Sequence, residues 1–294
     1  MKQKNQISWA NIENGLDTLL PAKGGNSDAR RGIITVNNGA KVFVKIGTSE
    51  NTKAWATKEI EAYNFLAEYS YPYAPRLLSV NQEKNGFAIE ALLIEEGWDW
   101  SDAWNSERLR KTFLAMDELA NIKPDDKYTE LLKPTLTNED NGWIILLNST
   151  EKQASLLNKL RVIGMENLID DIALHARKST EFNMQTDTLA HFDVRADNCA
   201  WNSSLGEVRL VDWNWLHMGD GRIDLAALLT HVHKSGLDVL KECRNRLHSD
   251  ALHWIAGFWL EAASKPIWLG GPAQLRDVQL QSGITALDLA ERVF

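Results

Sequence analysis

The stretch LAHFDVRADNCAWN (189–202), with VDWNW (211–215) shortly after it, decides the fold of this chain. Its central part, residues 191–198, contains a histidine, two aspartates, an arginine and an asparagine, with small or apolar residues on both sides. Asp and Asn often cap local turns by bonding to nearby backbone. For Asp193 alone that interpretation would be preferred, but the combination of Asp193, Asn198 and Asp212 indicates a functional site.

A hairpin is predicted directly after this cluster. The segments CAWN (199–202) and EVRLVDW (207–213) flank the turn residues SSLG (203–206), so the returning chain is expected to bring Asp212 beside Asn198. A carboxylate and an amide oxygen side by side suit a hard cation such as Mg²⁺. Asp193 would then be left to accept a proton or to orient a nucleophile.

The first ninety or so residues are predicted to be rich in strands. RGIITV (31–36) and KVFVKIG (41–47) carry β-branched residues, and the NNGA between them favours a tight hairpin. KAWATKEIEAYNFLAEYS (53–70) has apolar residues at helical spacing and predicts a helix. PRLLSV (75–80) and FAIEALLIEE (87–96) predict a second hairpin.

The composition changes at Glu95-Glu96-Gly97, and the rest of the chain is predicted to be mainly helical. Helices are expected near 106–121, 138–148, 151–182, 224–235, 237–248, 250–263 and 273–292. The fold class is therefore α+β, not an alternating parallel sheet. We expect a small β-rich N-terminal lobe at 1–94, with one main helix, and a larger mainly helical lobe at 95–294.

Composition excludes several classes of protein. The formal net charge of −8 argues against a nucleic-acid partner, because a phosphate-tracking surface needs clustered Lys and Arg. No apolar run is long enough to span a membrane, and the N-terminal residues do not form the apolar stretch of a signal peptide. Two cysteines are too few for a disulfide framework, which favours the reducing cytoplasm.

The motif HFDVRADN…VDW resembles the core of aminoglycoside phosphotransferases and choline kinases, which have a protein-kinase-like bilobal fold, and GDGRIDLAALL (219–229) resembles the segment that follows it in that family. The resemblance implies ATP-dependent transfer of a phosphoryl group to a hydroxyl. It implies that Asp193 is the catalytic aspartate and that Asn198 and Asp212 hold Mg²⁺. Lys45 corresponds to the lysine that reaches the nucleotide phosphates.

Other site residues follow from the same resemblance. Glu59 would pair with Lys45, with Glu61 as a competitor on a different helix face. The predicted hinge is 92–97, with Leu93 and Glu95 beside the nucleotide, and Arg195 would stabilise charge on the transferred group. The loop over the phosphates would consist of Gly24, Gly25, Asn26 and Ser27, although no GxGxxG or Walker pattern is present there. The chain departs from the family pattern where Phe192 replaces a small residue.

The resemblance leaves the acceptor open. Only eleven residues separate Asp212 from Asp224, so a protein kinase, which needs a long activation segment, is disfavoured. A small hydroxyl-bearing molecule is expected, and acidic residues of the helical part could draw a cationic one: Glu181, Asp187, Asp220, Asp250 and Glu261. A catalytically silent nucleotide-binding module and a metal-dependent hydrolase are the competing hypotheses. Neither oligomeric state nor a preference for ATP over GTP can be inferred from the sequence.

Overall fold

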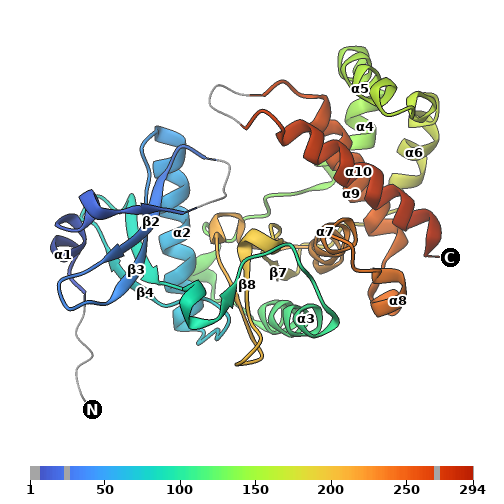
Figure 1. Cartoon of the computed structure of the whole chain (residues 1–294). Coiled ribbons are helices and arrows are strands. Elements are labelled where there is room, and N and C mark those ends of the chain that lie inside the picture. The colour runs from blue at the N-terminus through green and yellow to red at the C-terminus, as the bar shows by residue number, and fades with distance from the viewer. Residues whose placement is uncertain (1–6, 23–26, 268–271, 294) are drawn as a thin grey trace. The chain divides into compact units, whose positions relative to one another are not determined.

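The computed structural model describes residues 7–22, 27–267 and 272–293. The chain forms two compact units (Figure 1). The first consists of Met1–Asp102, Glu107–Leu132 and Ala196–Leu216, and the second of Ala103–Ser106, Lys133–Arg195 and His217–Phe294. The expected α+β class is confirmed, because one unit contains an antiparallel sheet and the other is mainly helical.

Within the described residues, the sheet of the first unit has five strands in the order β1-β2-β3-β5-β4. Their bounds are β1 Leu20–Pro21, β2 Arg30–Thr35, β3 Lys41–Ile46, β4 Leu77–Val80 and β5 Gly86–Glu90. The predicted hairpin joins β2 to β3, and Gly39 in its turn has a φ of +80°. This left-handed conformation costs glycine little because it has no Cβ atom.

The two faces of β3 have different surroundings. Val42 and Val44 lie in a buried cluster with Ile12 of α1 (Trp9–Glu13) and Ile34 of β2. Successive side chains of a strand point to opposite faces, so Lys45 projects from the other face. That face contacts α2 (Glu50–Glu68), which begins at a capping box formed by Ser49 and Thr52.

The apolar positions predicted for this helix, at residues 56, 60, 63 and 66, are all buried. The predicted strand at 87–96 is shorter than expected. Strand β5 ends at Glu90, which pairs with Val42, and the described strand β3 extends only one residue beyond that pair, to Lys41. The chain continues instead into a 3₁₀ helix, Ile94–Glu96, and turns at Gly97, whose φ is +90°.

The first unit extends past residue 94 because later segments pair with it. Strand β6 (Trp98–Asp99) pairs with β8 (Cys199–Asn202), and β8 forms the predicted hairpin with β9 (Glu207–Leu210). Helix α3 (Ser106–Asn121) supplies Arg108, whose guanidinium donates to the carbonyl oxygens of Ala196 and Cys199 at 3.3 and 2.6 Å. The compact units therefore do not divide the chain at a single point.

The second unit contains a bundle of helices and the two-stranded pair β7 (Thr188–Ala190) and β10 (His217–Gly219). Its helices are α4 Gly142–Leu147, α5 Thr150–Val162, α6 Ile172–Ser179, α7 Gly221–Lys234, α8 Val239–Cys243, α9 Ser249–Ser264 and α10 Leu275–Arg292. Helix α9 is buried along most of its length and packs on α10, α4 and α7 (Figure 1).

The predicted helix at 151–182 is interrupted. The chain leaves α5 at Gly164, whose φ of +71° is not helical, passes through a 3₁₀ helix at Glu166–Ile169 and resumes as α6. In the described part of the chain, no helix is both long and apolar enough to cross a membrane.

Candidate active site

Lys45 is held between two carboxylates. Its ammonium group donates to Oε2 of Glu59 and to Oδ1 of Asp212, both at 2.6 Å. The lysine side chain is 10% exposed and that of Glu59 is 3% exposed, whereas Asp212 is 29% exposed. Because buried charges are stable only when they are paired, the lysine and its two partners form one charge cluster. The carboxylate of Asp212 is the member open to a ligand.

Burial and the neighbouring charges determine the pKa values of the groups in this charge cluster. Burial alone would lower the pKa of Lys45, but attraction to Glu59 and then to Asp212 outweighs it, and the pKa lies above the usual value. Burial raises the pKa of Glu59 to about 7, and the charge of Lys45 opposes that rise. Of the two acids considered for this pairing, the structure joins Lys45 to Glu59, while Glu61 is exposed.

Asp212 follows β9 in an unusual backbone conformation. Its φ is +66°, in the left-handed region that non-glycine residues rarely occupy. The next residue, Trp213, is fully buried, and its indole Nε1 donates to the carbonyl of Leu210 at 2.9 Å. The ring of Trp213 also packs edge-on against Tyr71, with centroids 5.6 Å apart. This anchored tryptophan fixes the turn that directs Asp212 toward Lys45.

Asn198 lies at the other end of the same hairpin. It closes the 3₁₀ helix Ala196–Asn198, and its carbonyl accepts from the amide of Val211 at 3.0 Å. Val211 precedes Asp212, so this hydrogen bond brings the backbones of the two predicted metal-holding residues together. The donor set of one carboxylate and one amide oxygen fits Mg²⁺, which completes its shell with water and substrate phosphates. In the described residues, no group of three or more His, Cys, Asp or Glu could hold a metal by itself.

The predicted phosphate loop lies mostly outside the described residues. Gly24, Gly25 and Asn26 fall there, and Ser27 is described. The hydroxyl of Ser27 accepts a hydrogen bond from the guanidinium of Arg31 at 3.2 Å. In the antiparallel register of β2 and β3, Arg31 lies opposite Lys45.

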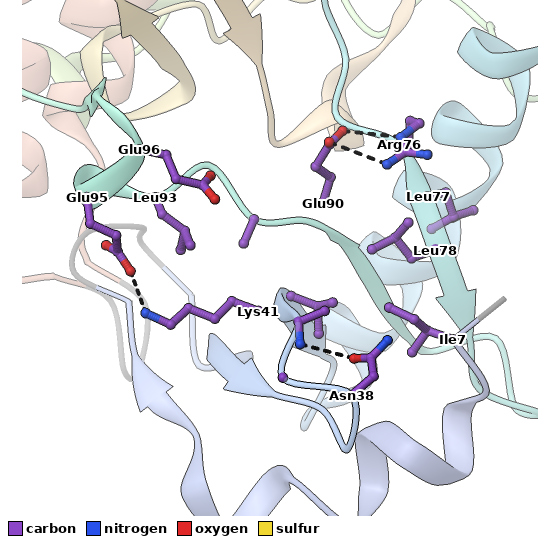
Figure 2. Close-up of a pocket in the computed structure, with 14 residues that line it drawn as sticks. Ile7, Asn38, Lys41, Arg76, Leu77, Leu78, Glu90, Leu93, Glu95 and Glu96 are labelled. Carbon is purple, nitrogen blue, oxygen red and sulfur yellow. Dashed lines mark hydrogen bonds and ion pairs between the residues drawn. The ribbon is translucent and has the colours of Figure 1, made fainter. Parts of the chain in front are cut away.

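The predicted hinge borders a groove of 890 Å³ (Figure 2). Leu93 and Glu95 line it, and Glu95 forms an ion pair with Lys41. The carbonyl of Leu93 accepts from the amides of Glu96 and Trp98 at 3.0 and 3.2 Å. None of the described residues that line this groove is Lys45, Glu59, Asn198 or Asp212.

Asp193 belongs to the second unit, in the loop after β7. The buried carboxylate of Asp224 on α7 accepts from the consecutive amides of His191 and Phe192 at 3.0 and 2.8 Å. Phe192 adopts a φ of +62°, which is strained for a bulky residue. Arg195 donates to Oδ1 of Asp193 at 2.9 Å. Asp224 therefore holds the backbone just before Asp193, and Arg195 holds the Asp193 side chain.

The structure therefore groups the predicted residues in two sets. Lys45, Glu59, Asn198 and Asp212 belong to the first unit, and Asp193 and Arg195 to the second. The sequence reasoning did not identify Arg108 or Asp224 as supports of this site. A signal was available for Asp224, which lies in the motif GDGRIDLAALL, but nothing in the sequence relates Arg108 to the carbonyl groups of a segment 88 residues later.

Comparison with known proteins identifies the class of this chain. The sequence model of the phosphotransferase enzyme family matches residues 18–258. The chain belongs to this family of enzymes, and the suspected relationship is confirmed. Comparison with curated protein sequences finds no match.

Solved structures with the same fold come from small-molecule kinases. Choline kinase LicA from Streptococcus pneumoniae aligns with a TM-score of 0.59 at 13% identity, over 92% of this chain and 94% of the other. An ethanolamine kinase from Plasmodium vivax gives 0.59 at 15%, over 94% and 82%. An aminoglycoside phosphotransferase bound to streptomycin and ATP gives 0.54 at 13%, over 97% of both chains. At these identities the likeness establishes the fold.

Proposed function

We propose that this protein transfers the γ-phosphoryl group of ATP to a hydroxyl group of a small molecule. The observation that carries the proposal is the buried Lys45, paired with Glu59 and Asp212 in a chain of the phosphotransferase family. A lysine fixed in this way can reach the phosphates of a nucleotide as a point charge. The streptomycin complex of the similar aminoglycoside phosphotransferase contains ATP, which supports ATP as the donor.

Each residue of the candidate site has its own role in the proposed reaction. Lys45 binds the phosphates, and Glu59 holds the lysine in place. Asn198 and Asp212 would hold Mg²⁺, which supplies positive charge that neutralises the phosphates when bound. Asp193 accepts the proton of the substrate hydroxyl as the new P–O bond forms and the bond between the γ-phosphorus and the bridging oxygen breaks. ADP leaves, and Arg195 stabilises charge on the transferred group.

A small acceptor is favoured over a protein by the short segment after Asp212. The 3₁₀ helix Trp213–Trp215 is followed by β10, and α7 begins at Gly221. Strand β10 is paired with β7, so this segment is used within the fold and does not form a platform for a peptide. The two cysteines, Cys199 and Cys243, are free thiols, in keeping with a reducing compartment, and we propose the cytoplasm.

A phosphorylation screen tests the proposal. Wild-type protein and Asp193→Asn are incubated with MgATP and a set of hydroxyl compounds, and products are identified by mass. We expect one compound class to gain a phosphate, and Asp193→Asn to lose turnover by at least about 100-fold because it cannot accept the proton. MgATP affinity, measured by calorimetry, should be retained in the variant.

The exposed Asp170 provides a matched control, because Asp170→Asn makes the same chemical change on the surface, outside the loop at 191–195, and should leave turnover intact. Equal turnover in Asp193→Asn would refute its role as the base. Absence of MgATP binding in the wild type would overturn the kinase assignment, and MgATP binding without any product across the set would favour a silent nucleotide-binding module.

A further inference from the structure

An aromatic side chain of α9 packs on the loop that carries Asp193. The ring of Phe192, next to Asp193 in the chain, contacts Phe258 of α9 edge-on, with centroids 5.6 Å apart. The neighbouring Trp259 contacts His231 of α7 with centroids 5.4 Å apart. Phe192, Phe258 and His231 are all partly exposed. These three residues and Trp259 are called the acceptor wall below.

Helix α7 places His231 on the side of the Asp193 loop. His231 follows Asp224 by seven residues, about two helical turns, so the two share a face. Asp224 bonds to the amides of residues 191 and 192, which brings this face to the loop. Burial, and then the positive charges of Lys234 and Arg195, lower the pKa of His231 to about 3. Its imidazole is therefore neutral and offers one donor and one acceptor.

The charged groups next to His231 do not favour a cation at this wall. Asp193 is already paired with Arg195, and the two charged groups that act on His231 are both cations. Among the acids expected to draw a cationic substrate, Asp220 and Asp250 bind Arg222, at 2.7 and 3.4 Å. Glu261 is paired with Lys152 and, at 2.7 Å, with Lys265. These carboxylates are neutralised by the chain's own cations.

We infer that the acceptor is an uncharged alcohol whose apolar body lies against Phe192 and Phe258 and whose hydroxyl, presented to Asp193, also accepts a hydrogen bond from His231. The inference rests on the proposed function, because it concerns the substrate that presents its hydroxyl to Asp193. Partly exposed aromatic rings bind apolar groups by removing them from water. A neutral imidazole beside two cations attracts a polar group without a positive charge.

The test uses two probes that differ only in charge: choline, and its uncharged isostere in which a tert-butyl group replaces the trimethylammonium group. Binding of each to the full-length protein saturated with MgADP is measured by calorimetry. We expect the isostere to bind at least about tenfold more tightly than choline. His231→Ala should weaken the isostere by about three- to tenfold, the value of one hydrogen bond, and His231→Gln should recover part of that loss. His248→Gln, on an exposed histidine, should change nothing.

Three results would overturn this inference: choline binding as tightly as the isostere, neither probe binding, or His231→Ala leaving the affinity unchanged. Failure of the proposed function is detected separately, by the absence of MgATP binding or of phosphate transfer to any alcohol. Transfer to choline in preference to the isostere would refute the inference and leave the kinase assignment in place.

Discussion

At the scale of single residues, the site depends on one cation shared by two acids. Lys45 is the positive charge that both Glu59 and Asp212 contact at 2.6 Å. Without it, two carboxylates would face each other in a largely buried space, where desolvation is costly. In the proposed reaction the same lysine binds the nucleotide phosphates, so one side chain contributes both to stability and to the proposed chemistry.

A double-mutant cycle tests this coupling. Lys45→Met should lower the free energy of unfolding by about 3 kcal/mol, because it leaves buried carboxylates without their cation. Adding Glu59→Gln should restore about 1 kcal/mol or more, since it removes one uncompensated acid. Urea denaturation of the four proteins gives the interaction energy. Strictly additive effects would contradict the coupling, and Lys41→Met, which removes an exposed pair with Glu95, should be nearly neutral.

At the scale of elements, helix contacts in the second unit require small residues. A Cβ atom added to Gly142 of α4 would lie 2.0 Å from the carbonyl oxygen of Gly257 in α9. Two helices can approach this closely only where both lack side chains at the crossing. A Cβ atom added to Gly257 would in turn lie 2.4 Å from the ring of Trp143, which is also in α4, so neither glycine of the crossing can carry a side chain.

Gly142→Ala should therefore destabilise the protein by about 2 kcal/mol or more, because α4 and α9 must separate. Gly221→Ala is the matched control: its added Cβ would meet only Thr188 Oγ1, at 3.4 Å, at the start of α7. Its effect should lie within about 0.5 kcal/mol of zero. Thermal or urea unfolding of both variants decides the question, and equal stabilities would show that the crossing can relax.

At the scale of the whole molecule, a buried histidine pair makes stability sensitive to acid. His175 Nδ1 and His253 Nε2 lie 2.9 Å apart, and the ring of Trp143 stacks on both. Burial, and then the neighbouring His175 and Lys178, lower the pKa of His253 to about 4. In the unfolded chain a histidine titrates near its ordinary value of about 6.5. The neutral form is therefore tied to the folded state.

The sign of the pH dependence follows from this difference. The contribution of His253 is fully present above a pH of about 6.5 and is lost as the pH falls toward about 4, because the unfolded chain binds the proton first. Between pH values of about 6.5 and 5 we expect a loss of about 2 kcal/mol from this residue. Urea denaturation at both pH values measures it. His253→Gln should show a smaller loss than the wild type, and identical losses would contradict the assignment.

The local segments that carry the candidate residues could be predicted because each is short and has its own periodicity or turn. The strand predicted at 41–47 is β3, which carries Lys45, and the hairpin predicted around 203–206 joins β8 to β9 between Asn198 and Asp212. The length of β5 could not be predicted, because it depends on where its partner β3 begins. The break in the predicted helix at 151–182 was also missed, since apolar spacing continued through Gly164.

The sequence by itself determined the class of fold, the strand that carries Lys45 and the hairpin between Asn198 and Asp212, because these follow from local periodicity and turn residues. Only the tertiary structure decided that Glu59 pairs with Lys45, that Arg108 and Asp224 support the loops, and that Arg222 neutralises Asp220. Most of those contacts join residues that are far apart in the chain. The pairing of Lys45 also distinguishes Glu59 from Glu61, which lies two residues away on the same helix. Burial and charge pairing in the folded state select them, and no local pattern encodes that choice.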